Sequence, residues 1–145
     1  MGTWDVGPFD NDTAADFCGD LDEAAEAERP GLVRDALVRV LDAEDPLDQR
    51  LAVEAVAAAA LVAAQCPGGP PVTSPYGPDL AVPELPADLR DLAVRALHRV
   101  GSEPSELREL WADTDEYPSW RRSLELLLRA LTFPAPPADG APGPR

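Results

Sequence analysis

The chain has 145 residues, a formal net charge of −15 and twelve basic residues, all of which are arginine. This length is sufficient for one domain with a substantial hydrophobic core. The negative charge repels nucleic acid and anionic membrane surfaces over long range, so we expect neither as a partner and expect a basic protein to fit better.

Export signals, membrane anchors and disulfide patterns are not recognisable in the sequence. No positively charged region followed by an apolar run opens the chain, and the alanine-rich residues 51–64 contain Glu54 and are too short to cross a bilayer. We therefore expect a cytoplasmic protein. Cys18 and Cys66 have no Cys-x-x-Cys spacing and no neighbouring histidine, which favours buried free thiols over a disulfide or a metal site.

The first seventeen residues combine two aromatic residues, a turn and a helix start. Trp4 and Val6 alternate as they would in an extended segment, and Gly7-Pro8 turns the chain. Phe9 stands just ahead of Asn11, a good helix N-cap, and an apolar residue beside a cap packs back on the first helical turn. The pattern predicts an extended N-terminal segment, called the clasp below, that packs against the start of a helical domain.

The same stretch resembles the opening signature of the bacterial domain of unknown function 4259 family, Gly-x-Trp-x-x-Gly-Pro-Phe-x-Asn-Asp-x-Ala-x-Asp-Phe. A second element, Glu109-Leu110-Trp111 followed by an acidic gap and Trp120, is also similar to the family. The resemblance implies one domain over residues 1 to about 132. Because the family has no established activity, no catalytic role is transferred from it to any residue. The matching residues that we expect to be structural are Trp4, Gly7, Pro8, Phe9, Asn11, Asp12, Asp16 and Phe17.

Apolar residues recur at helical spacing along most of the chain, with glycine and proline between the segments. The third helical segment is apolar on more than one side, so we place it at the centre of the domain. We expect an all-α, single-domain bundle of about six helices, with the clasp near residues 111–120. The predicted helices cover about residues 11–28, 30–44, 46–66, 87–100, 102–112 or 105–112, and 118–131.

Two proline-rich stretches interrupt or follow these helices. Residues 67–86 contain adjacent glycines and several prolines, which predicts a long loop in the middle of the domain. This loop either lies across the helices through apolar residues such as Leu85 or is flexible. Residues 133–145 have little to bury, so we expect a disordered tail.

Asp12, Asp16, Asp20 and Glu23 line one side of the first predicted helix. Like charges at this spacing destabilise a helix slightly, and the helix dipole offsets this near the N-terminus. The row is either a solvated face or a divalent-cation site at Asp12 and Asp16. A row on one helix cannot wrap an ion, and no Asp-x-Asp-x-Asp-Gly loop is present, so we expect no metal and no other cofactor.

A cluster of aromatic and acidic residues separates the last two predicted helices. It consists of Trp111, Asp113, Asp115, Glu116, Tyr117 and Trp120. Such a set can receive an arginine or lysine of a partner through salt bridges and cation–π contacts. Alternatively, Trp111 and Trp120 anchor the helix pair in the core, because both coincide with leucine stripes, and only the acidic residues face solvent.

No motif for catalysis is recognisable in the sequence. The serines lack a nucleophile elbow, and His98, the single histidine, has no triad partner or second metal ligand at a suitable spacing. We therefore expect a non-enzymatic interaction module that binds a basic protein, of which a toxin neutralised by an immunity-type protein is one case. The alternative is a small-ligand or divalent-metal binding domain, with or without hydrolytic activity, that uses Asp12, Asp16 and the clasp. A third interpretation is that both acidic sets only maintain solubility.

Overall fold

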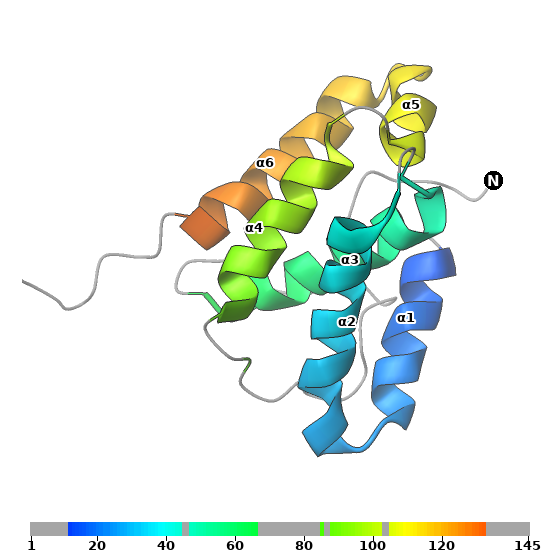
Figure 1. Cartoon of the computed structure of the whole chain (residues 1–145). Coiled ribbons are helices and arrows are strands. Elements are labelled where there is room, and N and C mark those ends of the chain that lie inside the picture. Colours follow the sequence, from blue (N-terminus) through cyan, green and yellow to red (C-terminus); the bar gives the residue numbers. More distant parts are fainter. Residues whose placement is uncertain (1–11, 45–46, 67–84, 86–87, 103–104, 133–145) are drawn as a thin grey trace, which may run out of the picture.

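The computed structural model of the protein describes residues 12–44, 47–66, 85, 88–102 and 105–132. These ranges contain six α-helices and one 3-10 helix (Figure 1), and the expected all-α, single-domain fold is confirmed. None of the described helices combines the length and apolar character needed to cross a membrane. In chain order the elements are α1 (Asp12–Glu23), η1 (Glu26–Glu28), α2 (Arg29–Asp42), α3 (Gln49–Ala64), α4 (Asp88–Val100), α5 (Glu106–Ala112) and α6 (Tyr117–Thr132).

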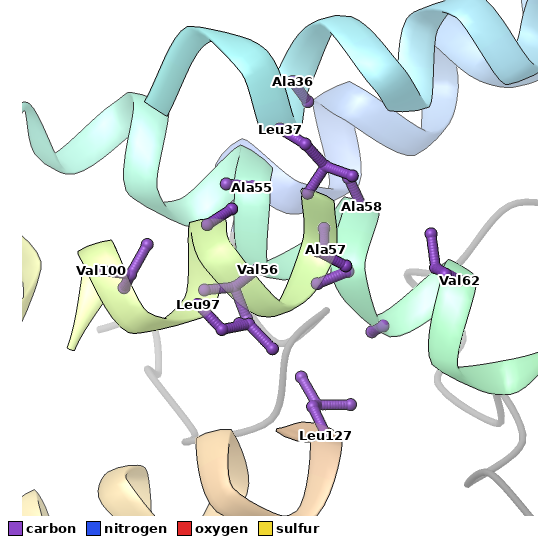
Figure 2. Packing of buried hydrophobic residues seen from close by; sticks show 14 of the residues in the cluster. Ala36, Leu37, Ala55, Val56, Ala57, Ala58, Val62, Leu97, Val100 and Leu127 are labelled. Atoms are coloured by element: carbon purple, nitrogen blue, oxygen red, sulfur yellow. The ribbon is translucent and has the colours of Figure 1, made fainter. Parts of the chain in front are cut away.

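Helix α3 lies at the centre of the bundle, as its apolar composition predicts. Every residue from Ala52 to Ala63 except Glu54 is buried, and the helix packs against α1, α2, α4, α5 and α6. Figure 2 shows Leu37 of α2, Leu97 of α4 and Leu127 of α6 around this alanine-rich stretch. Small side chains on α3 allow several helices to approach it closely, because the distance between packed helices depends on the side chains at the contact.

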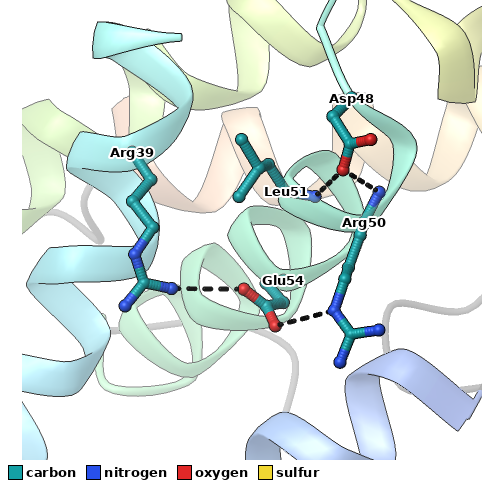
Figure 3. A network of polar contacts seen from close by, with 5 residues as sticks. All are labelled: Arg39, Asp48, Arg50, Leu51 and Glu54. Carbon is teal, nitrogen blue, oxygen red and sulfur yellow. Dashed lines mark hydrogen bonds and ion pairs between the residues drawn. The ribbon is translucent and has the colours of Figure 1, made fainter.

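The start of α3 lies later in the chain than predicted because Asp48 caps it. Its Oδ2 atom accepts hydrogen bonds from the backbone N–H groups of Arg50 (3.0 Å) and Leu51 (3.3 Å). One turn further on, Glu54 forms ion pairs with Arg39 of α2 (3.4 Å) and with Arg50 (4.0 Å), as Figure 3 shows. The negative charge of Glu54, which interrupts the apolar stretch from Ala52 to Ala63, is thereby compensated.

Helix α1 is shorter than the helix predicted over residues 11–28. It ends before Ala25, which is extended, with φ −62° and ψ 147°. The largely buried guanidinium of Arg29 donates from Nε to the carbonyl oxygen of Leu21 (2.9 Å) and from Nη2 to that of Ala24 (3.2 Å). These carbonyls lie at the C-terminal end of the helix, where acceptors lack a helical partner. The side chain of Arg29 therefore stabilises an early end to α1.

Helices α4 and α6 run antiparallel, and each supplies an arginine to the C-terminal end of the other. Nη1 of Arg121, in the first half of α6, donates to the carbonyl oxygen of Gly101 just after α4 (2.9 Å). Nε of Arg90, in the first turn of α4, donates to the carbonyl oxygen of Leu131 near the end of α6 (3.2 Å). The helix dipole puts partial negative charge at each of these ends, so both contacts are favourable.

Several predicted features lie outside the described residues. These are the clasp over residues 1–11, the tail over residues 133–145 and the central loop over residues 67–86 apart from Leu85. Leu85 packs against the core, and its backbone N–H donates to Oε1 of Gln65 at the end of α3 (2.8 Å).

Candidate functional site

The N-terminal end of α5 is tied to the N-terminal end of α3. Ser105 is buried beside Leu47 in an isolated backbone bridge, and the N–H of Glu106 donates to the carbonyl oxygen of Leu47 (2.9 Å). The carboxylate of Glu106 accepts a hydrogen bond from the N–H of Gln49 (3.0 Å). Oγ of Ser105 accepts from the N–H of Arg108 (3.4 Å) and so caps α5. Although α5 has only seven residues, these hydrogen bonds fix the position of its N-terminal end.

Trp111 and Trp120 face the core of the bundle. Their exposed fractions are 6% and 3%, respectively. Trp111 follows buried Leu107 by one helical turn, and Trp120 precedes buried Leu124 by one turn, so each tryptophan continues the inward face of its helix. The two rings are thus placed as in the alternative interpretation, as anchors of the α5–α6 pair.

Residues 113–116, called the acidic turn below, connect α5 to α6. Thr114 organises this turn, because its backbone N–H (2.9 Å) and its hydroxyl (2.8 Å) both donate to the carbonyl oxygen of Trp111. The hydroxyl also accepts a hydrogen bond from the N–H of Glu116 (3.1 Å). The side chains of Asp113, Asp115 and Glu116 are all exposed on this hydrogen-bonded backbone.

Tyr117 is partly buried and makes its aromatic contacts within the chain. The guanidinium carbon of Arg108 lies 5.8 Å from the centre of its ring, within cation–π range. The Tyr117 and Trp120 ring centres are 6.0 Å apart, with 32° between the ring planes. Of the predicted surface residues, the acidic ones face solvent, whereas the aromatic ones are used mainly to join α5 to α6.

Leu110, which the sequence analysis did not assign to the surface, is 45% exposed. Exposed carboxylates surround it in sequence, with Glu109 directly before it and Asp113 three residues after it. A helical-wheel argument could have found this residue: Leu107 and Trp111, four residues apart, define the inward face, and Leu110 falls at its edge. We call Glu109, Leu110, Asp113, Asp115 and Glu116 the acidic face.

The residues of the alternative cation site, Asp12 and Asp16, are both exposed on α1, as are Asp20 and Glu23. Within the described ranges, no group of three or more His, Cys, Asp or Glu residues is placed to hold a metal ion. Phe17, the last residue of the N-terminal motif, is buried in the core. Outside the described residues lie Trp4, Gly7, Pro8, Phe9 and Asn11.

The two cysteines and the single histidine are distant in sequence from the acidic face. They belong to other helices or helix ends. Cys18 and Cys66 are both buried, as expected, and neither forms a disulfide within the described part of the chain. Burial, with a further contribution from the charge of Asp22, raises the pKa of the Cys18 thiol to about 12, so this thiol is protonated at neutral pH. His98 is exposed on α4.

Comparison with protein families agrees with the resemblance seen in the N-terminal motif. A family model described as Domain of unknown function (DUF4259) matches residues 2–123. The match reaches from the clasp into the first half of α6 and ends before residue 132, the limit that the resemblance implied. No curated protein and no solved structure matches the chain.

Proposed function

The chain belongs to the Domain of unknown function (DUF4259) family, which assigns it no activity, and we propose that it binds a basic protein through the acidic face. In this proposal the protein is a non-enzymatic interaction module. A toxin bound and neutralised by an immunity-type protein is one concrete case.

The observation that carries the proposal is the exposure of Leu110 among exposed carboxylates. Protein interfaces combine an apolar anchor that loses water on binding with a polar rim that sets orientation and specificity. Leu110 supplies the anchor, and Glu109 and Asp113 stand on either side of it in sequence. A partner with arginine or lysine side chains around an apolar pocket complements this arrangement.

The acidic turn is organised before any partner arrives. Its backbone is held by the hydrogen bonds of Thr114, and α5 is capped by buried Ser105. Binding to a preorganised surface loses less conformational entropy than binding to a flexible one. The net charge of −15 also accelerates the approach of a basic partner, and this acceleration weakens as salt is added.

The test is capture from the native cytoplasm with the full chain as bait, at low and at high salt. A variant with Asp113→Ala, Asp115→Ala and Glu116→Ala removes three charges from the acidic face. The matched control, with Asp12→Ala, Asp16→Ala and Asp20→Ala, removes three exposed charges from α1. We expect the control to retain a basic protein that the acidic-turn variant loses.

The captured protein is then purified and titrated against each variant by calorimetry. Loss of two or three ion pairs at the rim is expected to raise the dissociation constant about 10- to 100-fold for the acidic-turn variant, with little change for the α1 control. Leu110→Ser should weaken binding at high salt as well, because the loss of an apolar anchor is not screened by ions. Equal effects of the two triple variants would contradict the proposal.

The same α1 control addresses the alternative of a divalent-cation or small-ligand site at Asp12 and Asp16. That alternative requires a melting temperature that rises with added cation in the native chain and not in the control. If neither triple variant changes capture or melting, the acidic residues serve solubility alone.

A further inference from the structure

A second surface feature lies on the outer side of α6. A hollow of about 390 Å³ is lined, among the described residues, by Pro118, Ser119, Arg122, Ser123 and Leu126. Leu126 is 55% exposed, and Leu110 is the other large apolar side chain that stands exposed in the described part of the chain. An accessible leucine beside a hollow is a typical place for an apolar group of a partner to bind.

On the described helix α6, which lines this hollow, basic residues outnumber acidic ones, in contrast to the chain as a whole. Helix α6 contains Arg121, Arg122 and Arg129 but a single acidic residue, Glu125. Arg121 is directed to the carbonyl oxygen of Gly101, whereas Arg122 and Arg129 are exposed. These two arginines stand four residues before and three residues after Leu126, so they share its side of the helix.

The two exposed leucines therefore have complementary surroundings. Leu110 is accompanied by the carboxylates of Glu109 and Asp113, and Leu126 by the guanidinium groups of Arg122 and Arg129. Both surfaces belong to one helix pair, α5 and α6, whose members are joined by the acidic turn (Figure 1). One copy of the chain thus carries both halves of a matching contact.

We propose that the acidic face of one copy binds the α6 hollow of a second copy, and that the contact is made twice in a two-fold symmetric dimer. Leu110 enters the hollow beside Leu126, and Asp113 pairs with Arg122 of the other copy. An isologous interface of this kind closes on itself, because each copy offers both patches to its partner. The dimer uses the acidic face but does not depend on the proposed basic partner, which would compete with it.

Repulsion between two chains of charge −15 opposes this association over long range. At 0.15 M salt the Debye length is about 8 Å, so the distant charges are largely screened while contacts that exclude water are screened less. We therefore place the measurement at that ionic strength. Complementary charges at the contact also fix the orientation of one copy relative to the other.

Sedimentation equilibrium of the full chain over a concentration series tests the proposal. The expected species have masses of 15.4 kDa and twice that value. Arg122→Glu and Asp113→Arg each place like charges in contact at two symmetric positions, so each is expected to raise the dissociation constant at least about 100-fold. Combining the two substitutions reverses both partners of the pair and should restore dimerisation.

Arg95→Glu is the matched control, since Arg95 is exposed on α4 and the change in charge is the same as for Arg122→Glu. Circular dichroism shows whether each variant is folded, and an arginine at position 113 is favourable at the C-terminal end of α5. A native chain that stays monomeric at millimolar concentration overturns the proposal. So does a folded double variant that fails to dimerise, or a control that dissociates as readily as Arg122→Glu. Arg122 is no part of the acidic face, so its variants leave capture of a basic partner intact and separate the two proposals.

Discussion

Leu110 and Trp111 are neighbours on α5, yet the side chain of Leu110 is 45% exposed while that of Trp111 is 6% exposed. The boundary between core and surface passes between them. Trp111 contributes to the packing of α5 onto the bundle, whereas Leu110 is available to another molecule. A substitution of Trp111 should therefore lower the stability of the fold, whereas a substitution of Leu110 should affect binding to another molecule.

Trp111→Ala is expected to lower the free energy of unfolding by about 3–5 kcal/mol, because it leaves a cavity under α5. Leu110→Ser should change it by no more than about 0.5 kcal/mol, as is usual for an exposed position. Urea denaturation followed by circular dichroism gives both values. A Leu110→Ser cost close to that of Trp111→Ala would show that Leu110 belongs to the core.

The two arginines that link α4 and α6, each by a hydrogen bond to the C-terminal end of the other helix, give a second prediction. Arg121→Met removes a charged hydrogen bond to the carbonyl oxygen of Gly101 and is expected to cost about 1–2 kcal/mol of stability. Arg90→Met should cost less, because Nη2 of Arg90 is buried with no hydrogen-bond partner among the described residues. The methionine removes that unsatisfied group and keeps the apolar stem.

The two sites lie at opposite ends of α4, roughly 16 Å apart along the helix, so the effects of the double variant should add within about 0.5 kcal/mol. Arg95→Met is the control for loss of an exposed arginine from the same helix. Chemical denaturation measures the free energy of unfolding of the two single variants, the double variant and the control. A control that costs as much as Arg121→Met would assign the effect to net charge instead of to the helix ends.

Acid titration tests the ion pair that joins α2 to α4. Arg34 donates two hydrogen bonds to the carboxylate of Asp88, at 2.7 Å and 3.0 Å, and these lower the pKa of Asp88 below its ordinary value of 3.8. A carboxyl group with a lower pKa in the folded state stabilises the fold above its unfolded pKa and loses that contribution as pH falls through the folded pKa. Because both side chains are well exposed, the effect is small and decreases with salt.

The expected result is a melting temperature lower for Asp88→Asn than for the native chain at pH 7, with the difference shrinking as pH falls below about 4. Asp91→Asn, in the same helical turn, is the control because it carries the same charge near the same helix end. Thermal melts at pH 7 and pH 2.5 decide the matter. A difference that persists unchanged at pH 2.5 would mean that the Asp88 charge is not its source.

The thiol of Cys18 should be inert in the folded protein. Its pKa of about 12 leaves almost no thiolate at neutral pH, and burial blocks access. We expect a disulfide-exchange reagent to modify it only as fast as the chain unfolds, at a rate that rises steeply with urea. Peptide mapping after a short exposure distinguishes Cys18 from Cys66, and rapid labelling of Cys18 in native buffer would contradict the structure.

Helix type and order were predictable along the chain. Helix α4 was expected over residues 87–100 and covers Asp88–Val100, and α6 was expected over residues 118–131 and covers Tyr117–Thr132. In both, an apolar stripe of period 3.6 coincides with the buried face. The end of α1 was missed because it depends on Arg29, whose side chain returns to Leu21 and Ala24, and periodicity holds no information on such a bond.

Of the predicted cluster of aromatic and acidic residues between α5 and α6, only the acidic part had a placement that the sequence decides. Charged side chains lose hydration when buried, so the exposure of Asp113, Asp115 and Glu116 follows from their chemistry. An aromatic side chain is stable either in a core or at an interface, and the sequence left both places open for Trp111 and Trp120.

The all-α class, the order of the helices and the central position of α3 follow from the sequence alone, because composition and local periodicity are properties of neighbouring residues. The family follows from the N-terminal motif and from the match of the family model. The inward direction of both tryptophans, the exposure of Leu110 and Leu126 and the exchange of arginines between α4 and α6 required the packed structure. Burial and long-range hydrogen bonds depend on which distant segments meet. That choice is made by the packing of the whole bundle.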